Sequence, residues 1–161
     1  MPNICLNTVV INWPLNSLKK IKELVEKSES EWWGLFEYVK PTPKIFCDME
    51  EVWMKLLAEA EATLTKTTEL PWYTEIEKLR AEAKAQFWCD HITSWRAANW
   101  WSKWDLCKED VLNIGYWESW ALVINFESAW SPHMYAWWDV CIAFNCEVFL
   151  GYSEDWFAVY K

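Results

Sequence analysis

Tryptophan constrains this chain more than any other residue type, because it occurs 16 times in 161 residues that include only three glycines. Six of the tryptophans form the doublets Trp32–Trp33, Trp100–Trp101 and Trp137–Trp138. Adjacent side chains point about 100° apart on a helix and 180° apart on a strand, so one ring of each doublet tends to face outward. Sixteen indoles therefore cannot all face one core. Since Trp is enriched in binding hot spots, we expect a partner-binding surface at Trp32, Trp33, Trp100 and Trp101; the alternative is a thick helical layer that buries both sides.

The charge and hydropathy of the chain exclude several classes of protein. The formal net charge is −9, from 15 basic and 24 acidic residues, and Arg80 and Arg96 are the only arginines. Proteins that bind nucleic acids neutralise phosphates with clustered Lys and Arg, so direct nucleic-acid binding is not expected. Asp139 interrupts the longest apolar run, 134–144, so we expect no membrane span of roughly 18–20 residues. The first residues lack the basic and apolar regions of a leader, which predicts a cytoplasmic protein with free thiols.

The periodicity of apolar residues predicts a mixed fold, with period two for strands and period 3.6 for helices. The predicted strands are 3–13, 34–39, 106–112, 120–126, 146–152 and 156–160, with a turn at 113–115. The predicted helices are one from Asn16 or Ser17 to about Lys27, one opened by Asp48-x-x-Glu51, one from Thr74-x-x-Glu77 to near Asn99, and one from Ser131–Pro132 to near Asn145. This order predicts an α+β fold in a single domain over 1–161, an antiparallel sheet with helices on one face and a helical insertion at about 48–99.

The sequence contains no pattern that carries chemistry. It lacks the glycine-rich phosphate loops and the Gly-x-Ser-x-Gly turn of hydrolases. Cys89 and His91 would point about 200° apart on the predicted helix and could not share a metal ion, so we interpret His91 as structural. His133, at the start of its helix, is interpreted as a surface residue. We predict no catalytic residue, no metal and no cofactor, and therefore no enzyme.

Three ordered motifs lie at the two ends and in the centre of the chain: Met1-Pro2-Asn3-x-Cys5-x-Asn7, Asn99-Trp100-x-x-Lys103-Trp104-Asp105 and Phe126-Glu127-x-Ala129-Trp130-Ser131-Pro132. Together they resemble a family of small phage and plasmid proteins with a YubB-type ferredoxin-like domain. The resemblance implies a ferredoxin-like fold and a mobile-element origin, and hence the cytoplasm of a bacterial host. It implies no reaction, and residues 48–84 match nothing in that family.

We interpret the residues of the second and third motifs as determinants of the fold. The family usually has Gly where this chain has Trp101, and Trp resists the left-handed conformation in which such a Gly ends a helix. We therefore expect Asn99 to cap the helix about two residues earlier. Asp105 is expected to accept backbone N–H bonds, and Lys103 to lie over an indole. The remaining members of this architectural set are Trp104, Trp130, Ser131 and Pro132.

The function we expect is that of a non-catalytic protein that binds a host protein, in the form of an inhibitor of a host defence system. An acidic inhibitor can occupy a basic nucleic-acid groove on its target. Glu50, Glu51, Glu59 and Glu61 are candidates for that contact, unless the helices of the insertion only cover the sheet. The rival hypothesis is a nucleotide or single-stranded nucleic-acid binding module whose exposed indoles stack on bases. Exposed Trp doublets without a host partner would predict a homodimer across a two-fold axis.

Overall fold

The computed structural model describes residues 4–28, 34–64, 66–102, 105–118, 120–129, 133–152 and 155–159. The chain divides into two compact units. The first, which we call the sheet unit, consists of Met1–Pro41 and Arg96–Lys161. The second, the helical unit, is Thr42–Trp95 and overlaps the predicted insertion at about 48–99.

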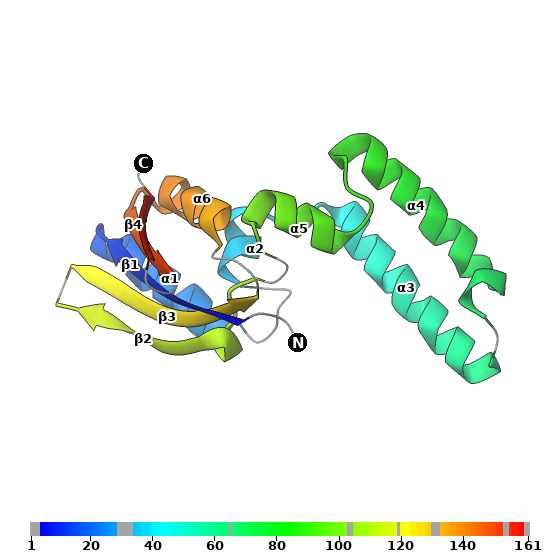
Figure 1. Cartoon of the computed structure of the whole chain (residues 1–161), viewed down its shortest axis with the longest axis horizontal. Coiled ribbons are helices and arrows are strands. Elements are labelled where there is room, and N and C mark those ends of the chain that lie inside the picture. Colours follow the sequence, from blue (N-terminus) through cyan, green and yellow to red (C-terminus); the bar gives the residue numbers. More distant parts are fainter. Residues whose placement is uncertain are drawn as a thin grey trace. The chain divides into compact units, whose positions relative to one another are not determined.

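An antiparallel sheet of five strands forms the sheet unit, which confirms the prediction of a mixed α+β fold (Figure 1). In chain order the strands are β1 (Ile4–Asn12), β2 (Val111–Trp117), β3 (Ala121–Ala129), β4 (Glu147–Tyr152) and β5 (Asp155–Val159). Their order in the sheet is β2-β3-β1-β4-β5. The central strand β1 pairs with both β3 and β4. The odd-numbered residues of β1, from Cys5 to Ile11, are buried, whereas Ile4 and Leu6 are exposed. Period two in the sequence therefore identified this strand.

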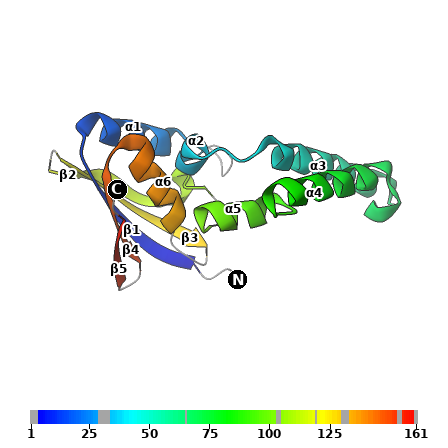
Figure 2. The ribbon, with the colours of Figure 1, turned by 90° about the horizontal axis from the view of Figure 1, so that it is seen from above.

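The described part of the chain contains six α-helices: α1 (Leu15–Lys27), α2 (Leu35–Val39), α3 (Lys44–Thr63), α4 (Pro71–Phe87), α5 (Ile92–Trp100) and α6 (Met134–Phe144). In the sheet unit α1 contacts β3, and α6 contacts α2 and β4 (Figure 2). In the helical unit α3 packs along α4. The predicted ends of α1 near Lys27 and of α6 near Asn145 are confirmed. None of the described helices is long and apolar enough to cross a membrane.

Each unit has its own apolar core. In the sheet unit the Phe36 ring lies 4.8 Å from that of His133 and 5.3 Å from that of Trp137, measured between centroids. Val52, Leu56, Leu70 and Ile76 form a core cluster of the helical unit. His133 is therefore a buried core residue, and its interpretation as a surface residue was wrong. Its imidazole packs between two aromatic rings of the core, 4.8 Å from that of Phe36 on α2 and 5.6 Å from that of Phe126 on β3, measured between centroids.

Residues 34–39 were predicted as a strand and instead contain the short helix α2. Phe36, Tyr38 and Val39 favour a strand locally. The buried carboxylate of Asp105 accepts the backbone N–H groups of Gly34, Phe36 and Glu37, at 2.9, 2.8 and 2.8 Å. These are donors at the first turn of a helix, which lack partners within the helix itself. A side chain distant in sequence therefore overrides the local preference.

The predicted strand at 106–112 and turn at 113–115 were also wrong. Residues 108–110 form a 3₁₀ turn, in which the Asp110 N–H donates to the Cys107 carbonyl at 3.1 Å. β2 begins only at Val111 and continues through Gly115, which pairs with Val123. The chain reverses after Trp117, where Glu118 has a φ of 57°. Asn113 and Gly115 predict a turn locally, but the backbone of Gly115 is extended within the strand.

The single helix predicted over 74–99 is two helices, because Trp88 takes a left-handed φ of 60° and ends α4. His91 immediately precedes α5, and its Nδ1 accepts the Ser94 backbone N–H at 3.2 Å. The other predicted starts were also displaced, since α3 begins at Lys44 and α4 at Pro71 rather than at the capping boxes. Pro at the first position of a helix loses no hydrogen bond and has a suitable φ.

Candidate functional site

The Trp doublets divide between core and surface, as their spacing predicts. In each of the two described pairs the first ring, Trp100 or Trp137, is fully buried and the second, Trp101 or Trp138, is exposed. The prediction that Trp100 contacts a partner is therefore wrong, because its ring packs in the core beneath the guanidinium of Arg96, 4.8 Å away. Trp32 and Trp33 lie outside the described residues.

Three other indoles lie together at one end of the sheet, and we call them the indole cluster: Trp13, Trp117 and Trp120. Their exposed fractions are 58%, 59% and 43%. The backbone N–H of Trp13 donates to the backbone carbonyl of Trp120 at 3.2 Å, which extends the β1–β3 pairing one residue beyond Asn12 and Ala121. The Trp117 and Trp120 rings lie 6.2 Å apart between centroids, on either side of the turn that joins β2 to β3. The pairing of β1 with β3 thus brings together indoles more than 100 positions apart in the sequence.

Carboxylates border the indole cluster. Glu118 accepts the Trp120 Nε1–H at 2.7 Å, which fixes one edge of that ring. Glu147 pairs with Asn12, next to Trp13. A shallow hollow of about 350 Å³ lies on this side, lined by Trp13, Pro14, Asn145, Cys146 and Glu147. The lining of the hollow contains acidic and apolar groups and no Lys or Arg, so its field favours a cationic ligand group.

Sequence reasoning missed the indole cluster because it placed the turn at 113–115. With that turn, Trp117 and Trp120 have no defined relation to each other or to Trp13. Two Trp residues on either side of Glu118 and Ser119, following a run of β-prone residues, were the available signal for a hairpin.

The four predicted acidic contact residues all lie on α3 and do not form one cluster. Glu51 and Glu61 are exposed, whereas Glu50 and Glu59 are half-buried. Glu59 accepts the Trp72 Nε1–H from α4 at 2.6 Å, so it links the two helices. At 1.5 Å rise per residue, Glu50 and Glu59 are separated by about 14 Å along the helix axis. They are spread along a solvated helix.

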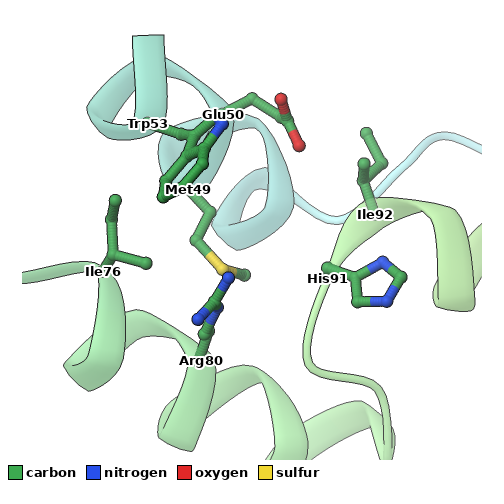
Figure 3. A pocket seen from close by; sticks show the side chains of 7 residues that line it. All are labelled: Met49, Glu50, Trp53, Ile76, Arg80, His91 and Ile92. Atoms are coloured by element: carbon green, nitrogen blue, oxygen red, sulfur yellow. The ribbon is translucent and has the colours of Figure 1, made fainter. Parts of the chain in front are cut away.

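Three ionisable residues, Glu50, Arg80 and His91, line a small pocket in the helical unit (Figure 3). Its lining comes from α3, α4 and the start of α5: Met49, Glu50, Trp53, Ile76, Arg80, His91 and Ile92. The Arg80 guanidinium is paired with Glu77 at 2.7 Å. The pocket volume is about 100 Å³, well below the roughly 300–1,000 Å³ of ligand sites. We therefore assign it to the packing between the helices.

Asp105 is the best-defined member of the architectural set. It accepts a fourth bond, from the Leu106 N–H at 2.6 Å, and the prediction that it binds backbone N–H groups is confirmed. Burial raises the pKa of Asp105 to about 6, against the lowering effect of these hydrogen bonds and of Arg96. Asn99 lies within α5 and does not cap it. The helix ends one residue later, because Trp101 adopts a φ of 60° after all.

Five members of that set, Lys103, Trp104, Trp130, Ser131 and Pro132, lie outside the described residues. The cysteines of the described part are thiols, outside any disulfide. Burial raises the pKa of Cys107 and of Cys146 to about 12, so neither supplies a thiolate at neutral pH. Within the described ranges no three His, Cys, Asp or Glu side chains converge as metal ligands would. No family model, curated protein or solved structure matches the chain.

Proposed function

We propose that this chain is a non-catalytic, phage- or plasmid-encoded protein that binds a host protein and inhibits a host defence system. The observation that carries the binding role is the indole cluster, in which three half-exposed Trp residues lie at one end of the sheet. The Trp117 and Trp120 rings are 6.2 Å apart between centroids, and the backbone of Trp13 pairs with that of Trp120. Rigid aromatic side chains on a fixed scaffold lose little conformational entropy on binding, which is why Trp dominates binding hot spots. The phage or plasmid origin and the defence target come from the resemblance of the three motifs.

The apolar area of the cluster is large enough to anchor a complex. An aromatic side chain buries about 150–250 Å² when it is fully covered. Three rings that are about half exposed therefore leave on the order of 300 Å² to be covered by a partner. At roughly 25 cal/mol per Å² this area is worth about 7 kcal/mol before the costs of association. Single exposed indoles elsewhere on the surface, such as Trp88, need no such explanation.

The charges beside the cluster favour a basic protein as the partner. Glu118 and Glu147 place two carboxylates next to the rings, and the whole chain carries −9. Long-range attraction would steer such a surface toward Lys and Arg side chains, whose aliphatic stems can pack on indole faces. A basic nucleic-acid groove on the target protein has this character.

The fold proposed with this function is ferredoxin-like. The sheet order β2-β3-β1-β4 supports it, since β1 and β2 are both antiparallel to the strand β3 that lies between them. The connections from β1 to β2 and from β3 to β4 both contain helices. Burial of one face of β1 is consistent with α1 and α6 covering that face. β5 adds an edge strand to this arrangement.

Capture from a host lysate tests the proposal. The tagged wild-type chain should retain one host protein in stoichiometric amount, and the double variant Trp13→Ala, Trp117→Ala should lose it. Trp88→Ala is the matched control, because it removes an exposed indole outside the cluster. Capture of chaperones alone by the wild type, or undiminished capture by the double variant, would refute the proposal.

A nucleotide or single-stranded nucleic-acid binding module is the second candidate function, favoured by the exposed rings at the sheet end. The carboxylates of Glu118 and Glu147 oppose it, because they repel phosphates. Titration of the intrinsic Trp fluorescence with nucleotides and oligonucleotides separates the two functions. Saturable quenching at micromolar ligand would favour the second candidate, and a flat titration would favour protein binding.

A further inference from the structure

Helix α6 is apolar on both of its faces. Its inner face buries Ala136, Trp137, Val140 and Cys141 in the sheet unit. Its outer face carries Tyr135, Trp138 and Ile142 at i, i+3 and i+7, with exposed fractions of 52%, 46% and 57%. A helix that is apolar all round is normally buried all round. The outer residues therefore form an apolar stripe on a helix that is already packed on its other side.

Trp101 extends this stripe beyond the start of α6. Its ring stacks on that of Tyr135, with 5.2 Å between centroids and 19° between planes. Trp101 is still 42% exposed, and it has a left-handed φ of 60°. Such a backbone is unfavourable for Trp, and strain of this kind is concentrated at functional positions. We call Trp101, Tyr135, Trp138 and Ile142 the α6 outer stripe.

The stripe is electrically neutral in a strongly acidic chain. The 11 residues of α6 include one charged side chain, Asp139, and its Oδ2 is paired with the Lys40 Nζ at 3.2 Å. The one carboxylate of α6 is thus already paired with a cation, in contrast to Glu118 and Glu147 beside the indole cluster. Two copies of a chain with charge −9 repel each other, and an apolar surface without unpaired carboxylates adds least to that repulsion when two copies meet.

From these features we infer that the α6 outer stripe is the interface of a homodimer, with a second copy of this chain as its occupant. Across a two-fold axis, antiparallel packing places Trp138 opposite its own counterpart. It also places Tyr135 opposite Ile142 of the second copy, and the converse contact follows by symmetry. Apolar residues at i, i+3 and i+7 are the spacing with which helices pack along each other.

The area of the stripe agrees with a dimer of this kind. Four side chains that are about half exposed leave roughly 300–450 Å² of apolar surface, using about 150–250 Å² for each aromatic ring. That matches the apolar centre of an interface of about 800 Å² per partner, the usual size for specific complexes. Solvated residues around the stripe, including the Lys40–Asp139 pair, would supply the polar rim.

Sedimentation equilibrium of the purified full-length chain tests the inference. The wild type should have twice the monomer mass of 19.3 kDa at about 100 µM, well above a micromolar dissociation constant. Trp138→Glu should give the monomer mass, because two carboxylates would then face each other across the axis. Trp88→Glu is the matched control and should remain a dimer, since it introduces the same charge in the helical unit.

A monomeric wild type at that concentration, or a dimeric Trp138→Glu variant, would overturn the inference. Circular dichroism of Trp138→Glu checks that the variant is folded, and Ile142→Glu serves as a second interface variant if it is not. The inference does not depend on the proposed host partner, because only the purified chain is measured. A Trp13→Ala, Trp117→Ala variant that fails to capture a host protein should still be a dimer.

Discussion

Substitution of Gly34 by Ala should destabilise the sheet unit strongly, because the chain packs against itself at that glycine. A Cβ atom there would lie 2.4 Å from the Leu106 carbonyl oxygen and 2.5 Å from Asp105 Cγ. Its φ of −96° is ordinary for any residue, so the effect is one of space and not of backbone strain. The atoms it would meet are a backbone carbonyl and a carboxyl held by four N–H groups, and neither can rotate away.

The size of the effect follows from these distances. Ordinary contact begins near 3.4 Å, so Gly34 and residues 105–106 must separate by about 1 Å. The Gly34 N–Asp105 Oδ2 bond of 2.9 Å and the Leu35 N–Leu106 O bond of 3.4 Å would then both exceed hydrogen-bond length. A buried N–H group without a partner costs about 1–3 kcal/mol. Two such groups and a similar cost for overpacking add up to about 3–9 kcal/mol, so Gly34→Ala should lower the free energy of unfolding by about 3 kcal/mol or more.

Urea unfolding followed by circular dichroism measures this loss, and Gly115→Ala is the matched control. Nothing lies within 4 Å of a Cβ at Gly115, which sits in the extended strand β2. The control should be neutral or more stable by up to about 1 kcal/mol, because Gly in a strand has excess conformational entropy to lose. A loss below about 1 kcal/mol for Gly34→Ala would refute the packing argument.

Two further predictions concern Asp105 and Leu64. Burial raises the pKa of Asp105 to about 6, from 3.8 in an exposed chain, so the unfolded chain releases its proton first as the pH rises. The free energy of unfolding should then fall by about 2 kcal/mol between pH 4 and pH 6 relative to Asp105→Asn, out of about 3 kcal/mol for the whole shift; parallel pH profiles of the two proteins would contradict this. Leu64→Gly should stabilise the helical unit by about 0.5–1 kcal/mol, because Leu64 is 93% exposed with a φ of 55°. A lower urea midpoint would contradict that prediction.

Local patterns in the sequence predicted the elements whose burial is regular. The alternation in β1 and the helical spacing of Leu18, Ile21 and Val25 each reflect one buried face, and both elements were found. α2 could not be found in this way, because its first turn is held by Asp105, 71 positions away from Gly34. A β-prone segment becomes a helix when distant partners accept its N–H groups.

The left-handed residues were the other source of error. Such positions are normally assigned to Gly or Asn, yet here Trp88, Trp101 and Glu118 have positive φ and no glycine does in the described part of the chain. The ends of α4 and α5 and the β2–β3 turn were misplaced for this reason. Tertiary contacts such as the stacking of Trp101 on Tyr135 offset the local strain, and they are not visible in a local pattern.

The sequence predicted that the candidate site contains exposed indoles, but it did not predict which indoles lie close together. The Trp excess correctly indicated exposed indoles, and the split of each described doublet followed from geometry alone. Which rings lie together depends on strand register. That register brings Trp13 beside Trp120, whereas Trp100 of the expected surface is in the core.

The central claim is that a host protein is bound through the indole cluster, and parallel affinity measurements test it most directly. The captured protein should be titrated with three forms of the full chain. They are the wild type, the double variant Trp13→Ala, Trp117→Ala, and a charge-reversed variant that carries Glu50→Lys, Glu51→Lys, Glu59→Lys and Glu61→Lys. Loss of hot-spot rings worth about 2 kcal/mol or more should weaken binding by roughly 30-fold or more. The charge reversal takes the net charge from −9 to −1 and removes part of the long-range attraction, but it should weaken binding less than the indole variant does at physiological salt, where exposed charges are largely screened. Unchanged affinity for the indole variant together with loss for the charge-reversed variant would place the binding surface on α3 and contradict the claim.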